Sequence, residues 1–205
     1  MMSRPERRIV LRGLAGALAL RVSRADAAAA VQAGEVETSR GDCFVRTISS
    51  QHPLTPNAAV FVGDSVGTGV DSSLGLLLGA ATKVRLGAET QLRIDQFIVN
   101  AGGALYLDHG AILYDHDPKE GADASAMRSP FGLIAVRGTR FFAGPSAGVF
   151  GVFVERGAVM VVGVNTAVNL GPGQGTNLAA PGAEPSPPAV WGPARVAAAM
   201  AQFTR

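Results

Sequence analysis

The stretch Val136-Arg137-Gly138-Thr139-Arg140-Phe141 lies between two apolar runs, Leu133–Val136 and Val149–Val154, which are rich in β-branched and aromatic residues. Such runs favour β-strands. Gly138 stands where a chain leaving a strand can adopt a positive φ, which is costly for other residues. Phe141 supplies a large apolar side chain for a core. The stretch therefore lies between two predicted strands.

Outward from this stretch, the chain between Gly34 and Ala180 repeats one theme, a short apolar run followed by Gly, Asp or Asn. The runs are Ala59–Val62, Leu74–Leu78, Thr82–Leu86, Gln91–Val99, Ala104–Leu107, Ala111–Tyr114, Leu133–Val136, Val149–Val154 and Val159–Val164. Two of them, at 82–86 and 91–95, alternate apolar and polar residues as half-buried strands do. No part of this region has the period of a long helix. The pattern predicts an all-β fold over residues 35–180, either a stacked-sheet sandwich or a short β-solenoid.

Three segments depart from this theme. Asp115–Ser129 is polar, lacks an apolar pattern and predicts a long exposed loop between two strands. Residues 181–193 are rich in Pro and Ala and predict a linker. A short C-terminal helix is predicted for 194–205, where Val196, Met200 and Phe203 share one helical face. A helix of about ten residues needs tertiary contacts, so we expect it to pack on the β domain; docking on a partner is the alternative.

The first 30 residues have the features of an export signal. A basic start that includes Arg7 and Arg8 precedes the short apolar run Gly13–Leu20, and Ala25-Asp26-Ala27 offers a small-x-small cleavage site. The segment Arg7–Arg12 resembles the twin-arginine export signal. The apolar run is too short to cross a bilayer, which takes about 20 residues. The sequence therefore predicts a periplasmic or secreted protein, and the alternative is a basic tail on a cytoplasmic protein.

Removal of the predicted export signal would change the net charge of the protein. The whole chain has a formal net charge of +2, but residues 1–30 hold six Arg and two acidic residues, so 12 basic and 14 acidic residues remain in 31–205. No sequence cluster of Lys and Arg interleaved with aromatic residues remains, which argues against a nucleic-acid partner. Cys43 is the only cysteine, so no intramolecular disulfide can form. Its apolar neighbours Phe44 and Val45 predict that it is buried.

Together these segments resemble the FecR domain, a β-rich periplasmic module. The matching elements, in chain order, are Val60–Val66, Thr68–Ser72, Leu74–Leu86, Leu92–Ile94, Leu105–Gly110, Val136–Phe141, Val154–Val162 and Val168–Gly175. Each element is short, and the order and spacing of the elements carry the resemblance, which covers residues 40–178.

The residues of this signature have structural roles of their own. They are Thr68, Gly69, Asp71, Ser72, Gly138, Thr139 and Phe141. Thr68, Asp71 and Ser72 can hydrogen-bond nearby backbone amides and fix a turn. Gly69, like Gly138, can adopt a positive φ. The signature is therefore a folding signature, and none of these residues is expected to be catalytic.

The best-known members of that family are anti-sigma regulators of the inner membrane. They join a cytoplasmic anti-sigma segment, a transmembrane helix and a periplasmic FecR part, which receives a signal from an outer-membrane siderophore receptor. The resemblance here covers only the periplasmic part, so we expect a stand-alone module without the other two segments. It implies a signalling or sensing role through contact with another envelope protein, with no enzyme activity and no cofactor. The alternative is a structural or glycan-associated role in the envelope.

One motif suggests a different function. Gly63-Asp64-Ser65-Val66-Gly67 fits the serine elbow G-x-S-x-G and resembles the first block of the SGNH esterases. A serine nucleophile needs a histidine base and a group that orients this base. The last histidine is His116, no Asp lies three residues before any histidine, and no Gly-x-Asn-Asp block exists. Strand-like sequence also follows Ser65, where an elbow requires a helix. An esterase that uses Ser65 is therefore a distant alternative.

Five polar residues are the predicted binding residues. Asp115, His116 and Asp117 could contribute metal ligands, but in a strand they would point to alternate faces, and they do not fit the calcium-loop pattern. We therefore predict no metal. Arg137 and Arg140 could bind an anionic ligand through bidentate contacts if they occupy a strand and its bulge. Solvated strand faces usually carry such charges, so a purely structural role stays open.

Overall fold

The computed structural model describes residues 30–47, 50–79, 81–98, 102–117 and 124–204. The strands are β1 (Gln32–Arg40), β2 (Cys43–Arg46), β3 (Gln51–Pro53), β4 (Ala59–Phe61), β5 (Ser65–Thr68), β6 (Ser73–Leu78), β7 (Thr82–Leu86), β8 (Gln91–Ile98), β9 (Gly102–His109), β10 (Ile112–His116), β11 (Ala124–Ser129), β12 (Gly132–Ser146), β13 (Val149–Val162), β14 (Ala167–Leu170), β15 (Gln174–Leu178) and β16 (Ala189–Val190). The helices are α1 (Pro193–Met200) and the 3₁₀ helix η2 (Ala201–Phe203). The predicted all-β fold with a short C-terminal helix is confirmed.

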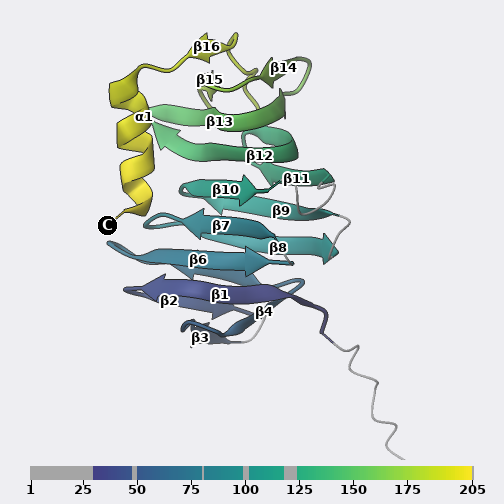
Figure 1. Ribbon diagram of the computed structural model, residues 1–205, viewed down its shortest axis with the longest axis vertical. Coiled ribbons are helices and arrows are strands. Elements are labelled where there is room, and N and C mark those ends of the chain that lie inside the picture. The colour runs from purple at the N-terminus through teal and green to yellow at the C-terminus, as the bar shows by residue number, and fades with distance from the viewer. Residues whose placement is uncertain (1–29, 48–49, 80, 99–101, 118–123, 205) are drawn as a thin grey trace, which may run out of the picture.

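The strands belong to one sheet that is folded into two layers. β3, β2, β5, β8, β9 and β11 form the first layer in that order, and β4, β1, β6, β7 and β10 form the second. β12 joins the layers, because residues 132–137 pair with β11 and residues 140–143 pair with β10. β13 pairs with β12 and extends the stack to β14, β15 and β16. In Figure 1 the strands lie one above the other along the long axis of the molecule.

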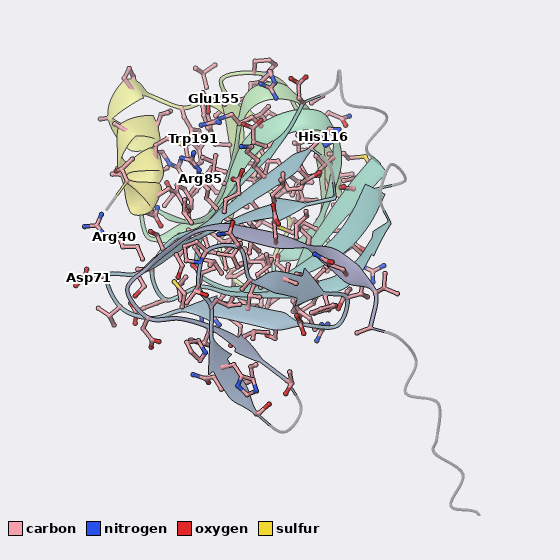
Figure 2. All side chains as sticks on the ribbon, turned by 60° about the horizontal axis from the view of Figure 1, so that its bottom comes forward. Arg40, Asp71, Arg85, His116, Glu155 and Trp191 are labelled. Atoms are coloured by element: carbon pink, nitrogen blue, oxygen red, sulfur yellow. The ribbon has the colours of Figure 1, made fainter. Side chains whose placement is uncertain are left out.

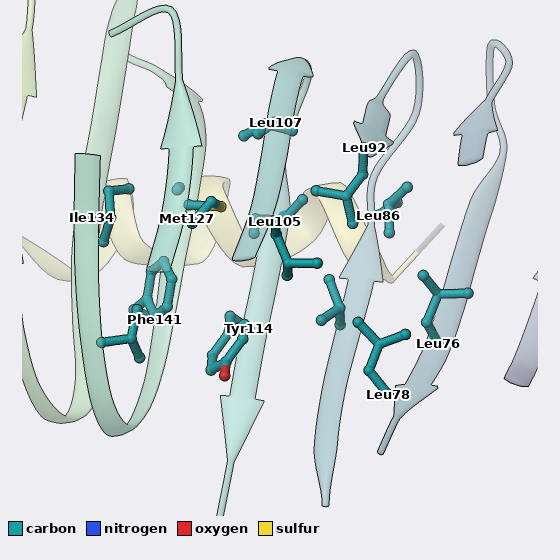
Figure 3. Close-up of a cluster of buried hydrophobic side chains, with 14 of the residues drawn as sticks. Leu76, Leu78, Leu86, Leu92, Leu105, Leu107, Tyr114, Met127, Ile134 and Phe141 are labelled. Carbon is teal, nitrogen blue, oxygen red and sulfur yellow. The ribbon is translucent and has the colours of Figure 1, made fainter. Parts of the chain in front are cut away.

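The core lies between the two layers and consists of rows of apolar side chains that cross the strands. One row, from β6 to β13, contains Leu76, Val84, Tyr114, Phe141 and Val154, each at most 1% exposed. Leu92, Leu105 and Met127 of the first layer belong to the same cluster (Figure 3). Between Thr82 and Leu86, buried and exposed residues alternate. The alternation predicted for this strand is therefore confirmed.

β12 passes from one layer to the other at a bulge. Two residues of β12, Gly138 and Thr139, face the single residue Gly157 of β13. Gly138 has a φ of +58° and Gly157 a φ of +84°, a region that favours glycine. A Cβ on Gly157 would also lie 2.6 Å from the carbonyl oxygen of Gly138. Because a bulge bends and twists its strand, this one turns β12 from the first layer into the second, and the positive φ predicted for Gly138 is confirmed.

The hydroxyl of Thr139 is buried in this bulge at an energetic cost. Thr139 is 0% exposed, and its Oγ1 has no hydrogen-bond partner within the described residues. An unsatisfied buried polar atom costs about 1–3 kcal/mol. We therefore expect Thr139→Val to raise the free energy of unfolding by about 1 kcal/mol, as measured by urea denaturation.

Thr82→Val is the matched control for this substitution. Thr82 is 3% exposed, but its Oγ1 is 3.0 Å from Nδ1 of His116, so this hydroxyl is hydrogen-bonded. The same change should therefore lower stability at Thr82. If both valine variants lost stability equally, the hydroxyl of Thr139 would not be a destabilising group.

The C-terminal helix packs on the outer face of the second layer. A separate apolar cluster contains Ala111, Phe142, Phe153, Trp191 and Ala199, with Val196, Met200 and Phe203 packed against it. The rings of Trp191 and Phe153 stack with their centroids 5.2 Å apart, and Phe203 meets Phe142 edge-on at 6.1 Å. The guanidinium carbon of Arg195 lies 3.6 Å from the centroid of the Trp191 ring. The predicted packing of this helix on the β domain is therefore confirmed.

The loop predicted for Asp115–Ser129 is wrong at both ends. Asp115 and His116 belong to β10, and Ala124–Ser129 forms β11, which pairs with β9 and β12. Residues 118–123 lie outside the described part of the chain. Met127 (1% exposed) is the one large apolar residue of β11. A strand built mainly from Ala and Ser lacks the apolar pattern by which strands are recognised.

Candidate functional site

Four charged residues gather on the outer face of the second layer, beside the bulge of β12. Arg140 donates from Nη1 to Oδ2 of Asp115 at 2.7 Å and from Nε to Oε2 of Glu155 at 2.8 Å. Arg156 donates from Nη2 to Oδ1 of Asp115 at 2.9 Å and to the carbonyl oxygen of His116 at 3.0 Å. Asp115 therefore lies between two guanidinium groups, and this ion cluster links β10, β12 and β13.

The ion cluster is a compensated set of charges. Burial acts to lower the pKa of Arg140, but hydrogen bonds with Glu155 and Asp115 outweigh it and raise this pKa above its ordinary value. Each arginine already binds a carboxylate, so an anionic ligand would have to displace one. The geometry therefore favours a structural role, in which the ion cluster links three strands, rather than the binding of an anion. The sequence did not predict Glu155, which meets Arg140 only through the register of β12 with β13.

The structure brings together two of the five predicted binding residues, Asp115 and Arg140. His116 follows Asp115 on β10, but its side chain is turned toward the core and is only 6% exposed. Asp117 follows β10 and is exposed. Arg137 lies in β12, and its side chain is outside the described part of the structure. The alternation along β10 thus separates Asp115 from His116, as predicted for a strand.

An apolar cleft of about 420 Å³ opens beside the β9–β10 and β12–β13 turns. Its wall includes Phe131 and Phe150, whose rings are nearly parallel (8°) with their centroids 4.3 Å apart. The buried side chain of Leu107 also lines it, and Asp108 and His109 add polar groups. A concave, mainly apolar surface with a few polar groups is typical of a binding site. The sequence did not predict this cleft, because it depends on two turns that are distant in sequence.

A second cleft of about 550 Å³ adjoins the first, since Gly110 and Pro145 line both. Asp71 and Glu89 line this acidic cleft, and Gln202 of η2 contributes to its wall. Within the described structure, neither carboxylate forms an ion pair or a hydrogen bond. Figure 2 places Asp71 near the C-terminal helix and away from His116. The apolar and acidic clefts together form one surface, the end groove.

Two signature residues fix the turns beside the end groove. Oγ1 of Thr68 donates to the carbonyl oxygen of Gly87 at 2.6 Å and accepts from the N–H of Thr90 at 3.0 Å. Oγ of Ser72 accepts from the N–H of Asp42 at 2.8 Å. The turn-fixing role expected of these two hydroxyls is confirmed.

Two other expectations for the signature are wrong. Gly69 does not have a positive φ; the residue with left-handed backbone in this turn is Asp71, at +52°. The carboxylate of Asp71 fixes no turn within the described residues and lines the acidic cleft instead. The packing at Gly69 is tight, because a Cβ there would lie 3.1 Å from Cβ of Asp42.

The serine-elbow motif forms a different structure. Ser65 begins β5, and its Oγ accepts a hydrogen bond from Nε2 of Gln91 at 3.0 Å. A strand therefore follows Ser65, where a nucleophile elbow has a helix. Cys43 is 3% exposed, which confirms its predicted burial. No three His, Cys, Asp or Glu side chains lie close enough to hold a metal ion within the described parts of the chain.

The predicted export segment, including Arg7 and Arg8, lies outside the described residues. None of the helices in the described ranges is long and apolar enough to cross a membrane.

Comparison with known proteins gives one family match and a similar fold. Residues 64–160, from the β4–β5 turn to most of β13, match the model of the family described as FecR protein. Two crystal structures of a protein from Parabacteroides distasonis, named provisionally as an anti-sigma factor, match with a TM-score of 0.54 and 16% identity. The matches cover 65% of this chain and 63% and 62% of those chains, so this chain spans less than two thirds of their length. No curated protein sequence matches this chain.

Proposed function

Because this chain contains a FecR domain, as the order of its motifs predicted, we propose that it is a non-catalytic module that binds another protein of the bacterial envelope in a signalling or sensing role. The observation that carries the proposal is the end groove, most of whose wall lies within the matched residues. The provisional name of the similar crystal structures supports a role in signalling.

The two halves of the end groove suit two parts of one polypeptide segment. The apolar cleft has room for a large apolar side chain, and the stacked rings of Phe131 and Phe150 offer it a flat surface. Asp71, Glu89 and Asp108 add negative charge, and the described residues that line the groove include no Lys or Arg. An extended segment with a large apolar residue beside Lys or Arg complements both halves. We propose such a segment of the partner as the occupant.

The proposed compartment rests on residues 1–30. The pair Arg7-Arg8, the short apolar run and the small-x-small site support export by the twin-arginine route to the periplasm. N-terminal sequencing of the protein from a periplasmic extract tests this route. An intact Met1 found only in the cytoplasmic fraction would contradict it.

A photocrosslinker at Ala179 tests the end groove. Ala179 lines the apolar cleft and is exposed, so benzoylphenylalanine can replace it without disturbing the core. Irradiation in cells is expected to attach a partner segment in which a large apolar residue adjoins Lys or Arg, identified by mass spectrometry. Asp71→Asn with Glu89→Gln should reduce the yield of this product, because both carboxylates attract the basic residue.

The matched control places the same photocrosslinker at Val164, which is 70% exposed in the turn after β13 and does not line the groove. Capture of the same segment from both positions would show that contact is not made through the groove. Capture of an acidic segment at Ala179 would contradict the proposed charge complementarity.

A further inference from the structure

Three arginines from distant parts of the sequence lie in one row on the outer face of the first layer. The row consists of Arg46 (β2), Ser65 (β5), Arg93 (β8), Tyr106 (β9) and Arg128 (β11), each paired with the next across adjacent strands. The residues that flank Arg93 and Tyr106 along their strands are buried in the core. Because side chains alternate along a strand, the row faces solvent. We call it the arginine row.

The guanidinium groups of the row are available to a ligand. Arg46 donates one hydrogen bond, to Oε1 of Gln51 at 3.2 Å, and Arg128 has no hydrogen bond or ion pair within the described structure. Arg93 pairs with Asp95, but its side chain remains 46% exposed. The hydrogen bond with Asp95 raises the pKa of Arg93. Two of the three cations thus lack a carboxylate partner, in contrast to the arginines of the ion cluster.

Aromatic rings hold two of these arginines against the sheet. The guanidinium carbon of Arg93 lies 4.9 Å from the ring centroid of Tyr106, and that of Arg46 lies 5.3 Å from the ring centroid of Phe44. Phe44 in turn covers Gly67, where a Cβ would meet the ring at 2.5 Å. Cation–π contacts of this kind reduce the freedom of the arginine side chains. Less conformational entropy is therefore lost when a ligand binds.

The spacing of the arginine row matches a ligand with widely spaced negative charges. Adjacent strands lie about 4.8 Å apart, and successive arginines are two strands apart, so their charges recur about every 10 Å along the stack. This distance is close to the length of a disaccharide. Ser65 and Gln51 lie between or beside the arginines and offer hydrogen-bonding groups for hydroxyls.

We propose that the arginine row binds a linear anionic polysaccharide whose carboxylates recur at about the spacing of a disaccharide. This inference concerns another face and another ligand class than the end groove, and it does not depend on the proposed protein partner. Arginine suits it because its planar fork binds carboxylates in a bidentate manner. Nucleic acid fits less well, since duplex phosphates follow one another about every 3.4 Å along each strand. Only about one phosphate in three would meet an arginine.

The test uses a hyaluronan oligomer, which carries one carboxylate per disaccharide and is longer than the row, since the row spans about 20 Å. The protein is the full chain, and a neutral dextran of equal length serves for comparison. Binding is measured by thermophoresis at low and at high salt. We expect the hyaluronan oligomer to bind and dextran not to bind, with affinity falling as salt rises. Arg46→Gln, Arg93→Gln and Arg128→Gln should each weaken binding about fivefold. The triple variant should not bind measurably.

Lys83→Gln is the matched control. Lys83 is 53% exposed on the second layer, where it pairs with Glu37. The substitution therefore removes one exposed cation outside the row. The affinity of the Lys83→Gln variant for hyaluronan should equal that of the unchanged protein, and all variants should keep the same melting temperature. Equal weakening by Lys83→Gln would show attraction to overall charge and overturn the proposal. Tighter binding of single-stranded DNA of the same charge would overturn it as well, and neither result would bear on crosslinking at Ala179.

Discussion

Phe141→Ala is expected to lower the free energy of unfolding by about 3–5 kcal/mol. Phe141 is 0% exposed, and its ring stacks on Tyr114 with the centroids 5.2 Å apart. It lies two residues after Thr139 of the bulge and is the first buried apolar residue of β12 in the second layer. Domains are stable by only about 5–15 kcal/mol in total. Urea denaturation should therefore show a large fall of the midpoint, or a chain that is unfolded in buffer.

Phe141→Leu distinguishes loss of volume from loss of the aromatic ring. A large apolar replacement keeps most of the buried volume and is expected to cost less than about 1.5 kcal/mol. Phe131→Ala is a second comparison, because Phe131 is only partly buried and lines the apolar cleft. A loss at Phe141 no larger than the loss at Phe131 would contradict the central place of Phe141 in the core.

Trp191→Ala is expected to release the C-terminal helix and to cost about 3–5 kcal/mol. The Trp191 ring lies over two glycines of the sheet, since a Cβ on Gly151 would approach it within 2.8 Å, and a Cβ on Gly175 would meet it even more closely. It also stacks on Phe153 and under the guanidinium of Arg195. A helix of this length has little stability of its own. Limited proteolysis should therefore remove residues after 192 from the variant faster than from the unchanged chain.

Val190→Ala is the control, because Val190 is the preceding residue and is 80% exposed. It should leave both the melting temperature and the proteolysis rate unchanged. If Trp191→Ala lowered the melting temperature but the tail stayed resistant to protease, the helix would be held by Phe203 and Arg195 without Trp191.

The sequence patterns were most informative where burial follows a simple period. Thr82–Leu86 alternates in both hydrophobicity and exposure, so this strand could be predicted. The helical face of Val196, Met200 and Phe203 also packs as predicted. Ala124–Ser129 could not be recognised as a strand, because its pairing with β9 and β12 defines it more than its composition does.

The surfaces that we propose for binding depend on contacts between distant strands. Asp115 and Arg140 could be named as candidates, but the pairing of β10 with β12 decides that they neutralise each other. Arg46, Arg93 and Arg128 are separated by more than 30 residues in the sequence, and only the order of the strands aligns them. No local sequence pattern contains that information. The role of Asp71 could not be predicted from the sequence either, since its left-handed φ and its place in the acidic cleft depend on the fold.

The course of β12 has a mechanical consequence. One continuous strand is hydrogen-bonded to β11 in its first half and to β10 in its second half, so both halves of the stack share a single rigid brace. Neither layer can separate from β12 unless one of these two ladders of backbone hydrogen bonds breaks.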